Sequence, residues 1–273
     1  LKKTDGNYAI STTEPGAREL ADPVNFGIFP AQYSTGAIFK FKKVDQKIIN
    51  KLKWKTFNPK IDLSKFKDSK GKSLPHDMPL FDKNFSDISL LINNQIVHLI
   101  LLHTVPSFHF GNTASPNYVR NADQLRFLEW YTTGSTDINL EHLSSIKQLN
   151  ANDRFIIVGD LNTDLKSTNP GTTVLRNLIK KTNLWMKFPS FTNESSGFAP
   201  PKLKLLLDYI VVSRGINVLE SGIIAPEANR IELGCNNKQS PLKNPSPDRV
   251  IVSYTRNNNS KCSVSVDYSY YEA

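Results

Sequence analysis

The sequence has few cysteines, no long apolar run and no cluster of zinc-type ligands. Cys235 and Cys262 are the only cysteines in 273 residues, too few for a disulfide-built fold; they fit one disulfide in a secreted protein or two thiols. The longest apolar run, residues 96–102, is far shorter than the roughly 18 residues of a membrane-spanning helix. No Cys/His spacing suggests structural zinc. We therefore expect a globular protein without a transmembrane segment.

Positive charge is concentrated in one segment. The formal net charge is +9, and residues 40–72 contain twelve lysines against three aspartates. This segment can form an electropositive face that attracts nucleic acid or another anion, or it can be a Lys-rich insertion that keeps the protein in solution. Nucleic acid is the less favoured partner because the segment lacks arginine and regularly spaced aromatics. The candidate anion-binding residues are Lys40, Lys42, Lys43, Lys53 and Lys55.

Apolar patterns predict strands and helices in mixed order. Asn93-Asn94 separates two apolar runs and predicts a hairpin, and Thr172 is a plausible helix cap. With no internal repeat and no clear linker, we expect a single α/β domain over residues 1–273. The expected strands are 34–41, 86–91, 95–102, 155–158, 203–213 and 249–254, and the expected helices are 121–131 and 172–181.

Polar residues follow or interrupt several of these strands. Asp160 and Asn162 come after the apolar run 155–158, where a carboxylate can hold a metal or activate water; a simple turn is equally compatible. On extended backbone the amide of Asn162 would face the same way as Asp160 and could orient a phosphate oxygen. His103 ends the strand 95–102 and suits phosphate contact or acid–base chemistry, although a lone strand-end histidine is more often structural. Asp208 interrupts an apolar strand, where a carboxylate needs a partner.

Taken in order, these motifs resemble the endonuclease/exonuclease/phosphatase superfamily, the deoxyribonuclease I-like proteins, and are closest to a bacterial-type exported branch. VGDLNTD at 158–164 resembles its GDxN loop, and LILLHTVPSF at 99–108 resembles its strand-His-x-x-Pro element. LLLDYIVVS at 205–213 resembles the strand that carries an orienting Asp. Segments 25–41 and 120–127 also resemble parts of that branch.

The resemblance implies a fold and a chemistry. The fold would be a four-layer α/β sandwich of two packed mixed β-sheets with outer helices. The chemistry would be attack of water on a phosphoester, assisted by Mg²⁺ or Mn²⁺. Asp160 would activate the water and be a candidate metal ligand, Asn162 would position the water, His103 would contact phosphate and Asp208 would orient a second histidine.

The chain departs from the family pattern at several positions. The family's Ser-Asp-His element reads SPDRVIV at 246–252, which puts Asp248 where the histidine belongs, and no histidine follows His142. The family's His-Asp-Glu reads Ala-Asp-Gln at 122–124. Nothing in residues 1–24 matches the family's first strands, with their Asn and metal-binding Glu. We expect these strands on a missing N-terminal fragment or a partner chain.

Two interpretations of function therefore remain open. The chain is either a metal-dependent phosphoester hydrolase with an incomplete catalytic set, or a pseudoenzyme that serves as an extracellular structural or binding module. The resemblance and three Asn-x-Ser sequons favour a secreted, periplasmic or cell-surface protein. A weaker alternative is an anion-binding protein that uses the Lys-rich segment.

Overall fold

The computed structural model describes residues 35–67, 73–107, 114–184, 193–194, 204–224, 249–255 and 261–266. The chain divides into two compact units, Leu1–Leu184 with Leu207–Gly215, and Trp185–Leu206 with Ile216–Ala273. The expected single domain over residues 1–273 stays a prediction.

The first unit is built on a mixed sheet of six strands in the order β1-β2-β3-β4-β8-β5. β3 and β4 pair in parallel, whereas the other neighbours pair antiparallel. The sheet and its helices make this a mixed α/β fold, as the sequence predicted. The strands are β1 (Lys42–Ile49), β2 (Phe85–Ile92), β3 (Gln95–Leu102), β4 (Arg154–Asp160), β5 (Asn183–Leu184) and β8 (Asp208–Val212).

The predicted hairpin is confirmed. β2 and β3 are joined by Asn93 and Asn94, whose φ angles are 50° and 59°. Positive φ at both central residues matches the type I′ turn, whose twist fits antiparallel strands, and asparagine tolerates this conformation better than most residues. The hairpin therefore follows from local sequence alone.

The first predicted strand is wrong. Residues 35–41 form no strand, and the side chain of Ile38 is fully exposed. The strand lies immediately downstream in the Lys-rich sequence, as β1, which is hydrogen-bonded only to β2 and forms one edge of the sheet. An edge strand tolerates lysines because one of its sides faces solvent, so its sequence lacks the apolar pattern of a buried strand.

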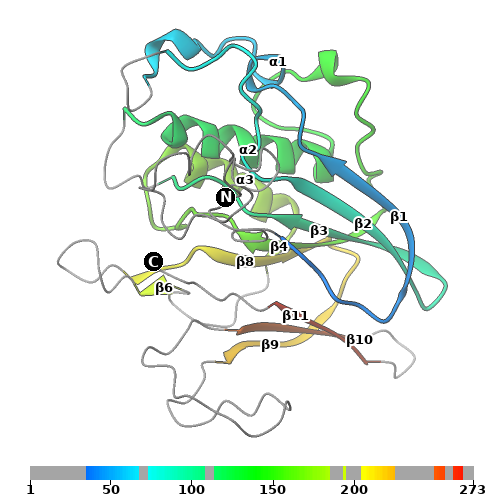
Figure 1. The fold of residues 1–273 in the computed structure, drawn as a ribbon. Helices are drawn as coiled ribbons and strands as arrows, with labels where there is room; N and C mark the ends of the chain where they lie inside the picture. The colour runs from blue at the N-terminus through cyan, green and yellow to red at the C-terminus, as the bar shows by residue number, and fades with distance from the viewer. Residues whose placement is uncertain are drawn as a thin grey trace, which may run out of the picture. The chain divides into compact units, whose positions relative to one another are not determined.

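Helices α2 (Pro116–Thr133) and α3 (Pro170–Lys181) cover one face of this sheet (Figure 1). Both contain the helical segments that the sequence predicted. The cap of α3 is Asn169, whose side chain accepts a hydrogen bond from the backbone N–H of Thr172, so the prediction of Thr172 as the cap is wrong. Asn169 precedes a proline at the first helical position, which is the preferred order at a helix start. Shorter helical turns are α1 (Trp54–Phe57), η1 (Leu63–Lys65) and η2 (Glu141–Leu143).

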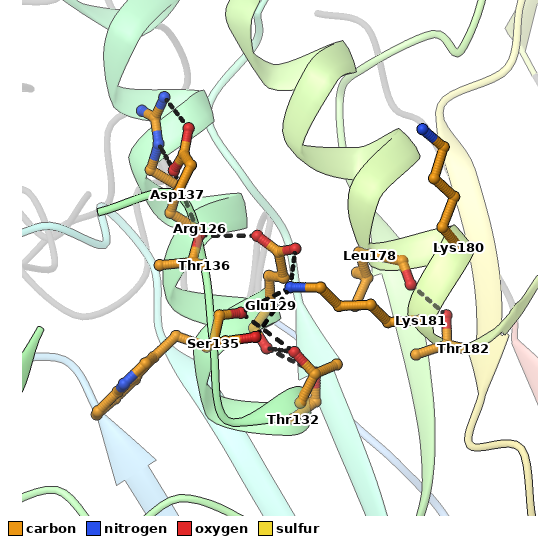
Figure 2. A network of polar contacts seen from close by, with 12 residues as sticks. Arg126, Glu129, Thr132, Ser135, Thr136, Asp137, Leu178, Lys180, Lys181 and Thr182 are labelled. Carbon is orange, nitrogen blue, oxygen red and sulfur yellow. Dashed lines mark hydrogen bonds and ion pairs between the residues drawn. The ribbon is translucent and has the colours of Figure 1, made fainter. Parts of the chain in front are cut away.

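A polar network joins α2 to α3 near their C-termini (Figure 2). The buried carboxylate of Glu129 lies 2.6 Å from the ammonium of Lys181 and accepts a hydrogen bond of 2.7 Å from the hydroxyl of Thr136. Lys181 also donates to the carbonyl oxygen of Ser135. A buried carboxylate needs such partners, because burial without them costs several kcal/mol.

The apolar contact between α2 and the sheet is largely aromatic. The ring of Phe127 lies 5.3 Å from that of Phe81 and 5.0 Å from that of Phe85, both in edge-on geometry. Tyr131 stacks on Phe127 and donates its hydroxyl to Asp87 of β2. These large side chains fix the position of α2 over β2.

The expected strand 203–213 is split. Lys204–Leu205 forms β7, which pairs with β6 (Asn193–Glu194) in the second unit, whereas β8 begins only at Asp208. Asp208 therefore opens a strand instead of interrupting one, and it is half-buried. A carboxylate at a strand end can meet polar groups that the middle of a buried strand does not offer.

The second unit contains a three-stranded antiparallel sheet in the order β11-β10-β9. Its strands are β9 (Val218–Ile224), β10 (Arg249–Thr255) and β11 (Lys261–Val266). β10 confirms the predicted strand 249–254. Within the described residues, no helix is long and apolar enough to cross a membrane.

Gly159 permits the close approach of β3 and β4 where both strands end. A Cβ atom built on Gly159 would lie 1.7 Å from the carbonyl oxygen of Leu102. Backbone cannot yield as a flexible side chain can, so any side chain here must push the two strands apart.

We expect Gly159→Ala to lower the free energy of unfolding by at least about 3 kcal/mol, because the new methyl group overlaps backbone. Urea denaturation measures this loss. Gly36→Ala is the matched control, since a Cβ at Gly36 meets nothing within 4 Å. Equal stability of the two variants would contradict this account of β3 and β4.

Candidate functional site

Four strands of the first unit begin or end at the same border of the sheet. This edge is formed by the ends of the strands and not by an outermost strand such as β1. In register, Phe85 of β2 pairs with Leu102 of β3, Leu101 with Val158 of β4, and Asp160 of β4 with Asp208 of β8. The start of β2, the ends of β3 and β4, and the start of β8 therefore meet there. This edge brings together His103, Asp160, Asn162 and Asp208, all four residues that the sequence singled out.

Asp160 is the central residue of this edge. Its side chain is 5% exposed, and its Oδ1 accepts the backbone N–H of Asn162 at 2.7 Å. Its Oδ2 lies 3.6 Å from the Nε2 atom of His103. The carbonyl oxygen of Asp160 accepts the N–H of Thr104, which holds the chain after β3 against the chain after β4. The carboxylate and the imidazole are thus close neighbours, within ion-pair distance but beyond a direct hydrogen bond.

Asp160 and Asp208 face each other as cross-strand partners. Burial, together with the neighbouring charge of Asp208, raises the pKa of the Asp160 carboxyl well above its ordinary value. The N–H of Asn162 and the charge of Lys83 oppose this shift only in part. Two neighbouring carboxylates, one of them buried, favour a shared proton or a nearby cation.

Asn162 differs from the sequence interpretation. Its φ angle is +47°, a left-handed conformation, and its side-chain nitrogen donates to the carbonyl oxygen of Thr104 at 2.9 Å. The expectation that it lies on extended backbone and faces the same way as Asp160 is therefore wrong. The turn around Asn162 instead presents its own N–H to Asp160, and asparagine is among the residues that tolerate such a turn.

Asn121 is a structural residue of the site that the sequence interpretation missed. It is fully buried in α2, and its side-chain nitrogen donates to the carbonyl oxygens of Val105 and Leu161 and to the Thr104 hydroxyl. Its oxygen accepts from the hydroxyl of Thr163. One amide thus ties the chain after β3 to the chain after β4. The sequence offers no clear signal for it, because Arg120 and Gln124 of the same helix are buried polar residues as well.

Asp82 and Lys83, just before β2, were also missed. Lys83 is 4% exposed, and its ammonium lies 2.7 Å from Asp82. An adjacent Asp-Lys pair looks like ordinary surface sequence. Only the pairing of Phe85 with Leu102 places these residues beside the chain that follows β3.

The residues of this edge do not form a metal centre by themselves. Among the residues that the structure describes, no group of three or more His, Cys, Asp or Glu side chains could hold a metal ion. Mg²⁺ keeps several of its waters and is often bound through one or two carboxylates, so Asp160 and its neighbour Asp208 could supply only part of a coordination sphere that water or substrate would complete. The expected Mg²⁺ or Mn²⁺ thus finds no complete donor set in the described part of the chain.

The candidate anion-binding lysines are mostly exposed. Lys40, Lys42, Lys43 and Lys53 lie at the surface. The ammonium of Lys55 donates to the carbonyl oxygens of residues 59 and 61, so this lysine is tied to its own loop. An anion-binding role of the segment stays a prediction.

Some predicted residues lie outside the described part of the chain. Asp248 and Cys235 are among them, as are residues 1–34. Cys262 belongs to β11, but its side chain is not described. The replacement of a catalytic histidine by Asp248, the orientation of a second histidine by Asp208 and the disulfide therefore stay predictions.

We expect Asp160→Asn to stabilise the protein increasingly as the pH rises. Because folding raises the Asp160 pKa, the folded state binds more protons than the unfolded state between the ordinary and the raised pKa, and stability falls with pH in that window. The amide keeps a hydrogen-bond acceptor and has no charge to bury. The ordinary pKa of aspartate is about 4. Urea denaturation in EDTA from that pH upwards measures the difference in the free energy of unfolding between Asp160→Asn and wild type.

Asp45→Asn is the matched control for that series, since Asp45 is exposed on β1. Its effect should vary little with pH. The raised pKa of Asp160 would be contradicted if the increase in the free energy of unfolding of Asp160→Asn over wild type stayed constant or became smaller as the pH rises.

Asn121→Ala should lower the free energy of unfolding by roughly 3 kcal/mol, because it leaves buried acceptors unpaired. Asn117→Ala, at a half-exposed position of the same helix, should change it by less than about 1 kcal/mol. Chemical denaturation of both variants gives the comparison, and equal losses would argue against the role of Asn121.

The sequence matches no protein family model and no curated protein. Among the solved structures that it resembles is an endonuclease/exonuclease/phosphatase family protein from Leptotrichia buccalis, which is 17% identical, with a TM-score of 0.32 over 52% of this chain and 45% of that chain. Beta toxin from Staphylococcus aureus is 18% identical, with a TM-score of 0.37 over 51% of this chain and 47% of that chain. Sphingomyelinase C from Streptomyces griseocarneus is 13% identical, with a TM-score of 0.36 over 67% and 54%.

A humanized D. rerio TDP2 is 12% identical, with a TM-score of 0.39 over 68% of this chain and 59% of that chain. One further beta toxin structure, a double mutant, is described with bound magnesium ions. The chain spans about half the length of the solved structures it matches. Likenesses of this size assign neither a substrate nor an activity.

Proposed function

We propose that the chain carries a phosphoester hydrolase site at the sheet edge that contains Asp160. The observation that supports this most is convergence: His103, Asp160 and Asp208 come from three separate segments and meet at one edge. The order of the sequence motifs resembles that of metal-dependent phosphoester hydrolases. If these residues only formed local turns, there would be no reason for the three segments to bring them together.

The chemistry that these residues support is water attack on phosphorus. A deprotonated Asp160 accepts a proton from water, and its raised pKa makes it a stronger base once it is ionised. The water oxygen forms the new bond to phosphorus while the bond to the leaving oxygen breaks. His103, 3.6 Å from Asp160, binds the phosphate in its charged form or exchanges the proton.

Mg²⁺ or Mn²⁺ is the cofactor that the motif resemblance implies. Asp160 and Asp208 would offer carboxylate oxygens to it, and the remaining ligands would come from water, from the substrate or from residues outside the described part of the chain. The substrate is proposed only as a phosphoester. Nucleic acid stays a less favoured member of that class, and export from the cell stays a prediction.

The four-layer sandwich is part of the same proposal. The six-stranded sheet with α2 and α3 on one face would supply two of the layers. The three-stranded sheet of β9, β10 and β11 is the candidate for part of the second sheet.

The second candidate function is a pseudoenzyme that binds a partner through this fold. It is supported by residues 122–124, where Ala-Asp-Gln stands in place of the family's His-Asp-Glu. It is supported as well by the sequence, in which Asp248 takes the place of a catalytic histidine. Such a protein would keep the polar edge as architecture and have no turnover.

Hydrolysis of a generic phosphodiester, a phosphomonoester and DNA tests the first proposal, with Mg²⁺ or Mn²⁺ and with EDTA. We expect Asp160→Asn to lower kcat/KM at least about 100-fold, the range of a general base. Asp45→Asn, an exposed carboxylate on β1, should keep wild-type activity. Loss of activity in EDTA would indicate that a divalent metal ion is required.

Turnover that survives in Asp160→Asn would contradict the proposed site. No turnover on any of these substrates, with a folded protein by circular dichroism, would favour the pseudoenzyme.

A further inference from the structure

The outer side of β1 (Lys42–Ile49) pairs with no other strand among the residues that the structure describes. β1 is the first strand of the six-stranded sheet, and its ladder runs only to β2 (Figure 1). Half of its backbone N–H and C=O groups therefore point away from the sheet. Such a row of groups can pair with a further extended strand, which is one way in which sheets bind partners. The side chains beside the row decide which strand fits.

The register with β2 shows which face of the sheet each side chain of β1 lies on. Asp45 pairs with Ser89, and Lys47 pairs with Asp87. The two partners are two residues apart on β2, so Asp45 and Lys47 share a face. Gln46, between them, lies on the opposite face. A carboxylate and an ammonium are thus placed on the same face, one on each side of Gln46.

These charges favour one register between β1 and the β1 of a second copy. A twofold axis perpendicular to the sheet makes the two strands antiparallel and keeps their faces, so that only every second register is possible. Centring the pairing on Asp45 sets two carboxylates opposite each other, and centring it on Lys47 sets two ammonium groups opposite each other; both arrangements are unfavourable. Centring it on Gln46 places Asp45 of each copy opposite Lys47 of the other. The strand is therefore complementary to itself in this register.

The exposed apolar side chains of β1 agree with the same register. Val44 and Ile48 are each 52% exposed, and they lie two residues on either side of Gln46. The register therefore brings Val44 of one copy near Ile48 of the other and covers apolar surface at both ends of the paired stretch. Val44 also ends the regular pairing, because the ladder to β2 shifts between Lys43 and Asp45.

The lysines and the bulge of β1 restrict its partners without excluding this one. Both features usually protect an outermost strand from indiscriminate pairing. The ammonium of Lys47 donates to the hydroxyl of Tyr131 at 2.8 Å and to the carbonyl oxygen of Lys147 at 3.3 Å. An ammonium has three donors, so one is left for a partner. The carboxylate of Asp45 is exposed and can accept it.

We propose that β1 pairs with β1 of a second copy of this chain, antiparallel and centred on Gln46, so that two six-stranded sheets join into one. The pairing goes beyond the hydrolase proposed above and does not depend on it. The paired stretch is short and buries less surface than the interfaces of stable complexes, so the dimer is weak and forms at high protein concentration.

A cysteine at the centre of the register tests the pairing. Directly opposite residues of an antiparallel ladder have Cβ atoms about 5 Å apart, near the reach of a disulfide. We expect Gln46→Cys to form a disulfide-linked dimer under mild oxidation, seen on a non-reducing gel. Ile48→Cys is the matched control, because Ile48 faces Val44 and not itself in this register. Wild type shows any linkage through Cys235 or Cys262.

Charge reversal gives a second measurement, which needs no cysteine. Sedimentation velocity from about 1 µM to about 1 mM follows weak association. We expect Asp45→Lys to weaken the dimer at least about tenfold, because two ion pairs become two repulsive pairs. Asp77→Lys makes the same change of net charge at an exposed residue outside the strands and should leave the dimer nearly unchanged. Circular dichroism shows whether both variants are folded.

Several results would overturn the proposal. They are a monomer at all these concentrations, a dimer that Asp45→Lys and Asp77→Lys weaken equally, and linkage of Gln46→Cys no faster than that of Ile48→Cys. Hydrogen exchange of the β1 amides identifies the other possible occupant: slow exchange of every second amide in the monomer would show that another segment of the same chain pairs there. Absence of phosphoester turnover would overturn only the hydrolase.

Discussion

The contact between Gly159 and the carbonyl oxygen of Leu102 is the constraint on which the site depends. It lets the only parallel pair of the six-stranded sheet close tightly where both strands end. Because β3 and β4 run in the same direction, the residues that follow them leave the sheet on the same side. His103 and Asp160 meet for this reason, and the hydrogen bonds of Asn121 and Asn162 secure the chain beyond them.

The second organising feature is the compensation of buried charge. Solvent hardly reaches the side chains of Asp160, Glu129 and Lys83, and Asp82 forms an ion pair with Lys83. Each carboxylate has a cation or a histidine nearby, but only Asp160 also faces a second carboxylate. Glu129 is matched by Lys181 and Thr136, and its role is to join two helices. Asp160 differs in that burial and the charge of Asp208 raise the pKa of its carboxyl.

Much of this architecture was predictable from sequence, for identifiable reasons. Two apolar runs separated by two asparagines predict the hairpin β2–β3. The Gly-Asp-Leu-Asn sequence indicates the end of β4. The edge strand β1 was missed because one of its sides faces solvent and lysines suit it. Asp208 was placed inside a strand because apolar sequence on both sides does not reveal where pairing starts. Lys83 was missed because its location depends on the register of two strands, which no local pattern encodes.

The attachments of α2 to α3 have a consequence for how the molecule can change. Asn121 packs against Gly171, where a Cβ would lie 2.1 Å from the asparagine oxygen, and Glu129 binds Lys181 at the other end. The two helices are therefore registered at two separate points. A residue inserted in α3 between these points would turn its far end by about 100° and break one attachment or the other. Variation in length among relatives should accordingly spare this helix and accumulate in the connections outside it.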